Sequence, residues 1–267
     1  MNSIMNKKLK NTIYYCLGII LVGIILQLLS FAKGNEIFFP NILTILKTFF
    51  KSIVTIETYT YIGTTLLELL ISISISFIIG IILGVFASIF DSFYKILKPL
   101  ITILRCLPMI ILIIILILSV NVSTAPIIAT IIVVTPIIYE GTYQGIKTID
   151  RNLIDVYKLH SNTTPKIVFK VFLPLISSHS KASYTNALGM GIKVLITTEY
   201  LCGKNNTLGR AIILASQNIE YEKIYAYSLI LVILVLLLEL VPNLISFLYY
   251  KITYLRSKNI LNLESIN

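Results

Sequence analysis

Long apolar runs separated by shorter polar segments dominate the pattern of this chain. A helix needs about 20 residues to cross a bilayer, whereas the core of a soluble domain does not need apolar runs of that length. The pattern therefore predicts an all-α membrane protein with about six transmembrane helices. These helices are expected at about 12–32, 60–89, 98–119, 123–145, 181–200 and 224–250.

The fifth of these segments, 181–200, is the most polar of the six. Polar and charged groups are costly in the hydrocarbon of a bilayer, so they usually lie against protein or line a pathway. We therefore expect this helix to lie inside the protein rather than against lipid. It contains Asn186, Gly189, Gly191, Lys193 and Glu199.

A shorter amphipathic helix is predicted between the first two transmembrane helices. Apolar residues recur there at helical spacing, and Pro40 stands near the start, a position that suits proline. The pattern is typical of a helix that lies on the membrane with its apolar face inward. That face carries Ile42, Ile45, Leu46, Phe49 and Ile53, while Asn41, Lys47 and Lys51 lie elsewhere.

Composition supports the membrane assignment, and the basic residues predict an orientation. Charged residues make up 13% of the chain, against about a quarter in soluble proteins. With the N-terminus inside, 14 of the 22 Lys and Arg residues fall in inner segments and 6 in outer segments. By the positive-inside rule, residues 1–11, 146–180 and 256–267 are cytoplasmic. This distribution explains the net charge of +10 better than binding to nucleic acid does.

The sequence contains no pattern typical of a catalytic, cofactor or metal site. Its three cysteines, Cys16, Cys106 and Cys202, lack the spacing of a zinc site or a disulfide framework. A phosphate-binding loop of the Gly-x-x-x-x-Gly-Lys-Ser/Thr type is absent as well. We therefore predict a protein that is not an enzyme and does not hydrolyse ATP itself.

The polar, basic segment 146–180 holds two predicted short helices. Asp150 suits the N-cap of the first, and Thr164 with Pro165 suits the start of the second, which stops before Pro174. The first helix is too short to cross a membrane, yet it is rich in apolar residues, which suits docking into a groove on a protein partner. These residues are Leu153, Ile154, Val156, Tyr157 and Leu159.

The same segment resembles the cytoplasmic coupling loop of ABC-importer permeases. That loop has Glu-Ala-Ala, a Gly and a final Ile-x-Leu-Pro, at the intervals that separate Asp155-Val156-Tyr157, Ser161 and Val171-Phe172-Leu173-Pro174 here. The chain thus departs from the family at Asp155, Val156, Tyr157 and Ser161. The residues before it, Gly145 to Asp155, resemble the family's lead-in of Gly-x-x-x-(Val/Ile)-Asp-x-x-Leu-x-Glu.

Other segments resemble the nitrate, sulfonate and taurine type of permease, and the similarity covers about residues 12–255. Phe38-Phe39-Pro40 resembles an extracytoplasmic Phe-Pro-x-Pro, and Arg105-Cys106-Leu107-Pro108 resembles the Arg-Pro-x-Pro that opens the third helix. After the fifth helix, Glu199, Gly203 and Leu208-Gly209 resemble a Glu followed by Gly-Leu-Gly.

The resemblance implies a type I ABC-importer permease fold in the cell membrane. It implies a path for a small polar solute such as nitrate, a sulfonate, taurine or a vitamin precursor. The implied partners are a cytoplasmic ABC ATPase dimer, an extracytoplasmic solute-binding protein, a second permease subunit in a homodimer, and the bilayer. Contact with the ATPase would involve Asp155, Val156, Tyr157, Leu159, Ser161, Val171, Leu173 and Pro174, and gating or the pathway would involve Arg105, Pro108 and Glu199.

Carboxylates in or near the apolar segments leave a second function open. For Glu68 and Glu239 we expect a paired or interfacial position, and for Glu199 a structural or gating role. The alternative function is a self-sufficient secondary transporter or channel, which would need an ion-coupling cluster or an internal repeat. Neither is evident in the sequence. Gly80-x-x-x-Gly84 and Gly141-x-x-x-Gly145 are spaced for close helix contacts.

Overall fold

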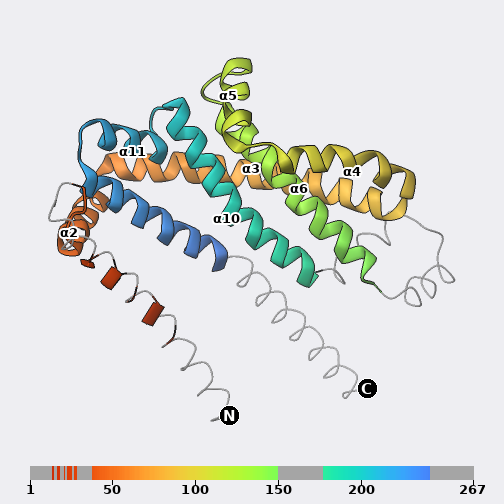
Figure 1. Cartoon of the computed structure of the whole chain (residues 1–267), viewed down its shortest axis with the longest axis horizontal. Helices are drawn as coiled ribbons and strands as arrows, with labels where there is room; N and C mark the ends of the chain where they lie inside the picture. Colours follow the sequence, from red (N-terminus) through yellow and green to blue (C-terminus); the bar gives the residue numbers. More distant parts are fainter. Residues whose placement is uncertain are drawn as a thin grey trace, which may run out of the picture.

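A computed structural model of the chain describes residues 38–149 and 177–240, together with nine positions of a helical N-terminal segment. Those nine are residues 14, 17, 18, 21, 23–25, 27 and 28. Every regular element in these described residues is a helix, which confirms the predicted all-α fold (Figure 1).

The helices follow one another with short connections. In chain order they are α2 (Ile42–Ile53), α3 (Ile56–Ile89), α4 (Asp91–Cys106), α5 (Met109–Ser119), α6 (Ala125–Lys147), α10 (Ser177–Cys202) and α11 (Leu208–Gln217). A further helix covers Tyr221–Leu240. The bounds of α3, α6 and α10 agree within a few residues with the predicted second, fourth and fifth membrane helices.

The core lies where α3, α6 and α10 pack against one another (Figure 1). Leu69 and Ile73 from α3 meet Val134 and Ile138 from α6, and α10 adds Ala187, Leu188, Ile192 and Leu195. Since lipid tails are as apolar as these side chains, close van der Waals packing must hold such helices together rather than escape from water. The prediction that the polar fifth segment lies inside the protein holds for one side of α10, which buries Gly191 and Glu199, whereas Asn186 and Lys193 are exposed.

Besides Leu69 and Ile73, helix α3 presents small and polar residues to the core, whereas many of its other large apolar residues are exposed. Thr65, Ser72, Ser76, Gly80 and Gly84 are all buried, at spacings of seven, four, four and four residues along one face. Ser72 and Ser76 satisfy their hydroxyls by donating to the carbonyl oxygens of Glu68 and Ser72, each at 2.7 Å. This inside-out pattern suits a helix surrounded by lipid.

Gly80 and Gly84 allow α3 to approach α6 closely, as their spacing predicts. A Cβ on Gly80 would lie 2.7 Å from Cβ of Ile138, and one on Gly84 would lie 2.7 Å from Cβ of Thr142. Neither gap admits a methyl group, so the two helices need glycine at both positions.

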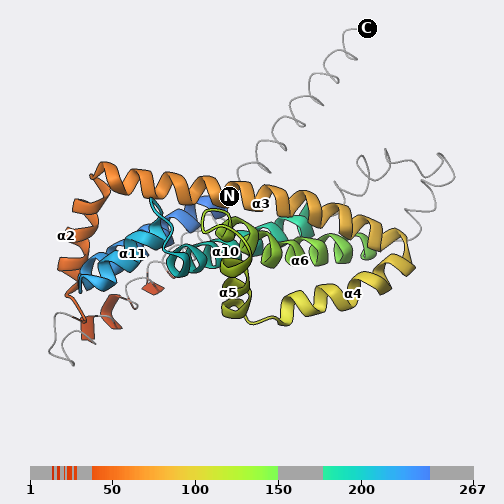
Figure 2. The same cartoon turned by 90° about the horizontal axis from the view of Figure 1, so that it is seen from above.

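The predicted amphipathic helix is present as α2. Asn41 caps it by accepting a hydrogen bond from the backbone N–H of Leu43 at 3.3 Å. Its Phe49 packs with Ala226 and Ile230 of the helix Tyr221–Leu240, and Ile45 is buried as well. Figure 2 shows α2 turned across the end of α3. The apolar face is thus divided between residues in protein contacts, such as Phe49, and the exposed Leu46.

The third predicted membrane helix, 98–119, is not one continuous helix. The chain forms α4 and α5, which meet at Leu107 and Pro108 with a bend of 97°. Proline disfavours helical backbone in the residue before it, and Leu107 accordingly has an extended conformation with φ −62° and ψ 125°. The hydrophobic pattern did not indicate this break, because apolar residues stand on both sides of Pro108.

Three helices within the described residues are long and apolar enough to cross a membrane: α3, α6 and Tyr221–Leu240. The bent pair of α4 and α5 would make a fourth span. The protein is therefore a multi-pass membrane protein, whereas the full set of six spans stays a prediction.

Candidate functional site

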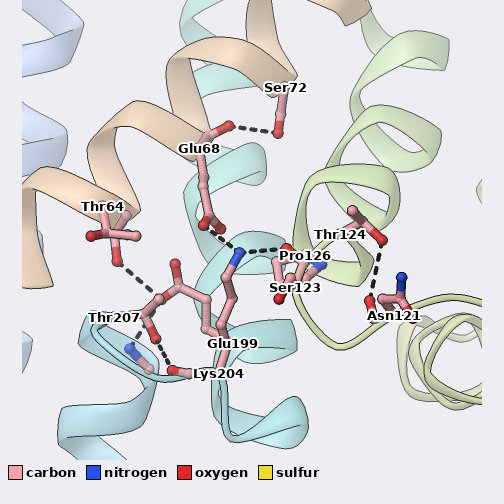
Figure 3. Close-up of polar contacts among 12 residues, drawn as sticks. Thr64, Glu68, Ser72, Asn121, Ser123, Thr124, Pro126, Glu199, Lys204 and Thr207 are labelled. Atoms are coloured by element: carbon pink, nitrogen blue, oxygen red, sulfur yellow. Dashed lines mark hydrogen bonds and ion pairs between the residues drawn. The ribbon is translucent and has the colours of Figure 1, made fainter.

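Three segments that are far apart in the sequence meet at a buried polar site. They are the N-terminal half of α3, the turn between α5 and α6, and the end of α10 with the turn that follows it (Figure 3). We refer to Glu68, Glu199 and Lys204, the charged residues at this site, as the charged cluster. Removing three ionisable groups from water costs free energy, which contacts between these groups and their neighbours must offset.

Glu199 is fully buried near the end of α10. Its Oε2 accepts one hydrogen bond from the Thr65 hydroxyl at 3.1 Å and another from the backbone N–H of Gly209 at 3.0 Å. The Thr65 hydroxyl in turn accepts from the backbone N–H of Leu208 at 3.1 Å. Glu199 therefore links α10 to α3 and to the first turn of α11.

Lys204 connects the other two segments of the site. Its ammonium donates to Oε1 of Glu68 on α3 and to the backbone carbonyl of Ser123, in the turn before α6 (Figure 3). The side chains of Glu68 and Lys204 are 7% and 13% exposed. Glu68 is therefore paired, as expected for a carboxylate in a membrane helix.

The backbone between α10 and α11 has an unusual conformation that places Lys204. Gly203 and Asn206 have positive φ angles of 63° and 58°, a region that glycine and asparagine tolerate best. Thr207 then caps α11 by accepting from the N–H of Arg210 at 3.2 Å, and it donates to the Lys204 carbonyl at 2.8 Å.

Gly209 is required by the close approach of α11 to the end of α10. A Cβ at this position would lie 2.4 Å from Cβ of Glu199 and 2.6 Å from the backbone nitrogen of Tyr200. The backbone atom cannot move without shifting α10 itself. Glu199, Gly203 and Gly209, which the sequence resemblance singled out together, thus meet in one structural unit.

Arg105 and Pro108 lie elsewhere, at the bend between α4 and α5. Arg105 pairs with Glu140 of α6, with 4.0 Å between Nη1 and Oε2. Glu140 also accepts a hydrogen bond from the Gln144 amide at 2.9 Å. In the described residues, Arg105 contacts Glu140 and not Glu199, so the three suggested gating or pathway residues do not form one site.

Comparison with known proteins decides the family. Residues 76–251 match the family model described as the binding-protein-dependent transport system inner membrane component. The chain belongs to this family. Among curated proteins, none matches it.

Solved structures show that the permease has the fold of ABC-importer membrane subunits. A chain of the MetNI methionine ABC transporter in an inward-facing conformation has a TM-score of 0.64 at 22% identity. The match covers 71% of this permease and 94% of that chain. A chain of a bacterial ABC transporter involved in the import of the acidic polysaccharide alginate has a TM-score of 0.65 at 14% identity. Here 92% of the permease and 98% of that chain are covered. At these identities the likeness concerns the fold alone.

The coupling residues suggested for this permease lie outside the described residues. They are Asp155, Val156, Tyr157, Leu159, Ser161, Val171, Leu173 and Pro174, and their role stays a prediction. The structure does describe the last turns of α6, which lead into them. Tyr143 stacks on Tyr94 of α4 with ring centres 4.6 Å apart, and Lys147 lies 3.6 Å from the Asp91 carboxylate.

Lys204 is the residue of the site that the sequence did not reveal. The sequence placed it among six basic residues in outer segments and did not indicate that its side chain is largely withdrawn from solvent. The available signal was Glu68, since a carboxylate in a membrane helix needs a cation. The candidates in the outer segments were Lys33, Lys47, Lys51, Lys204, Arg210 and Lys223, and choosing among them required the fold.

Proposed function

We propose that this permease is the membrane subunit of an ATP-driven importer for a small polar solute of the nitrate, sulfonate, taurine or vitamin-precursor type. The family match over residues 76–251 is the observation that carries the proposal. Support for the solute class comes from the resemblances at Phe38–Pro40, Arg105–Pro108 and Glu199–Gly209. The solute itself would be selected mainly by a separate binding protein.

Energy would come from a cytoplasmic ATPase dimer that contacts segment 146–180. The apolar residues of its first predicted helix would enter a groove on the ATPase. Helix α6 leads directly into this segment. The C-terminal end of α6 contacts α4 through Tyr143 and Lys147. Movement of the segment would therefore pass along α6 to α3 and α10, which pack against it.

Two permease subunits, in a homodimer, would enclose the path and expose it alternately to the two sides of the membrane. Closure of the ATPases on ATP would draw the two coupling segments together and rock the subunits. The binding protein would deliver solute at the outer side. In the proposed orientation the charged cluster lies toward that outer side, because α3 begins there and α10 ends there.

The orientation is testable by labelling single cysteines in a chain whose own cysteines have been replaced. Ile4→Cys, His160→Cys and Asn262→Cys should be protected from membrane-impermeant reagents in intact cells and become reactive after lysis. Labelling of His160→Cys from outside would contradict both the orientation and the assignment of segment 146–180 to the ATPase.

The transport function is tested by purifying the tagged permease in mild detergent together with products of neighbouring reading frames. We expect an ABC ATPase to co-purify. In liposomes, the complex should take up its solute only with ATP and binding protein, and the permease alone should show no ATPase activity. Uptake by the permease alone, driven by an ion gradient, would instead favour the secondary-transporter alternative.

A further inference from the structure

The charged cluster contains two carboxyl groups but one cation. Thr65 and Glu68 lie one turn apart on the same face of α3, and Glu199 binds the first while Lys204 binds the second. The two carboxyl groups are therefore neighbours, and Figure 3 shows both beside Lys204. Within the described residues, the cation of the cluster is Lys204, which contacts Glu68. With both carboxyls ionised, the cluster would carry one uncompensated negative charge.

Burial makes such an excess charge unfavourable. Glu68 is 5% exposed as a whole residue and Glu199 is fully buried, so the site has little water to solvate a second carboxylate. Buried ions persist in proteins when they are paired and hydrogen-bonded, and otherwise such groups take up or release a proton. A metal cation is a poor solution here, because the ammonium of Lys204 already occupies the site and repels it.

The hydrogen bonds of Glu199 distinguish its two oxygens. Both donors, the Thr65 hydroxyl and the Gly209 N–H, point to Oε2, whereas Oε1 is buried and has no partner. A carboxylic acid has this asymmetry, because its carbonyl oxygen accepts and its hydroxyl donates. Glu68 shows the complementary pattern. Its Oε1 accepts from Lys204, and its Oε2 is buried without a partner.

We propose that the cluster binds one proton, held on Oε1 of Glu199 and donated to Oε2 of Glu68. Glu199 is then a neutral carboxylic acid, while Glu68 remains ionised and pairs with Lys204. A single proton satisfies both partnerless oxygens and brings the net charge of the cluster to zero. The three segments are thereby joined by a neutral, hydrogen-bonded site, a property independent of which solute the permease carries.

The proposal predicts different responses to two isosteric substitutions. Glu199→Gln keeps the neutral form, since its amide oxygen accepts from Thr65 and Gly209 and its NH2 group donates to Glu68. The melting temperature of the purified full-length protein should therefore stay within about 2 °C of the original. Glu68→Gln leaves Lys204 without its counter-ion and should lower the melting temperature by roughly 10 °C. Adding Lys204→Met to Glu68→Gln should recover part of that loss.

Infrared difference spectroscopy observes the proton directly. The spectrum of the original protein minus that of Glu199→Gln, both at neutral pH, should contain the C=O stretching band of a protonated carboxyl group. The exposed residue Glu57 provides the control, because Glu57→Gln should remove a carboxylate band instead. A carboxylate band in the Glu199→Gln difference would overturn the proposal. So would a Glu199→Gln protein that is less stable than Glu68→Gln or that fails to fold.

Discussion

At the residue scale, the stability of this permease depends on a few polar side chains that are buried between helices. The Lys204 ammonium joins α3 to the turn before α6, and Glu199 joins α3 to α11. Removing one member of a buried pair leaves the other without compensation, which typically costs about 3–5 kcal/mol. An exposed pair is worth about 0–1 kcal/mol, because water and salt screen it. An exposed ion pair can therefore serve as the control for a buried one.

Lys204→Met should therefore destabilise the permease strongly, whereas Lys223→Met should have little effect. Lys223 also pairs with a glutamate, Glu220, at 2.8 Å, but its side chain is 42% exposed. The melting temperatures of both variants in detergent can be measured by following the reaction of their cysteines with a thiol-labelling reagent as the temperature rises. Equal effects of the two substitutions would contradict the importance assigned to the buried pair.

Gly209→Ala tests the close contact between α10 and α11. The added methyl group would meet Cβ of Glu199 and the Tyr200 backbone, so we expect a loss of about 1–3 kcal/mol or more. Gly189→Ala is the control on α10, because its methyl group would find only ordinary contact, 4.0 Å from Oε1 of Glu239. Similar melting temperatures for Gly209→Ala and the original protein would show that this contact relaxes easily.

At the element scale, α3 decides how closely the other helices pack. Gly80 and Gly84 face α6, and apart from core residues such as Leu69 and Ile73, many of its large apolar residues face outward, where lipid would solvate them. The break at Pro108 shows the effect of a single residue, since it divides a mostly apolar segment into two helices. Hydrophobicity therefore determines which segments enter a membrane, but it does not determine where a helix bends.

Replacing Gly80 and Gly84 together by alanine should separate α3 from α6. Both methyl groups would lie within 3 Å of α6 atoms, so the double variant should unfold at a lower temperature and form less folded protein. Gly63→Ala on the same helix has open space around it and should be neutral or slightly stabilising. Size-exclusion profiles and melting curves distinguish these outcomes.

At the scale of the whole molecule, the proposed function requires that segment 146–180 contact an ATPase. Tyr157→Asp would place a charge in the proposed groove, where it would lack a partner. We expect this variant to insert normally in the membrane, to lose the ATPase during purification and to lose uptake by at least about ten-fold. Lys258→Asp, in the predicted cytoplasmic tail, is the control and should retain both properties. A Tyr157→Asp permease with a full complement of ATPase and normal uptake would contradict the docking assignment.

The sequence by itself determined the all-α membrane fold, the amphipathic helix α2, the packing of one side of α10 against protein and the family resemblance. These follow from the period and polarity of local segments, which physical chemistry relates directly to helices and lipid. The tertiary structure alone decided that Lys204 pairs with Glu68, that Arg105 pairs with Glu140 and not with Glu199, and that α4 and α5 diverge at Pro108. Each of these depends on which surfaces meet after folding. Sequence spacing carries no such information for residues 136 positions apart, such as Glu68 and Lys204.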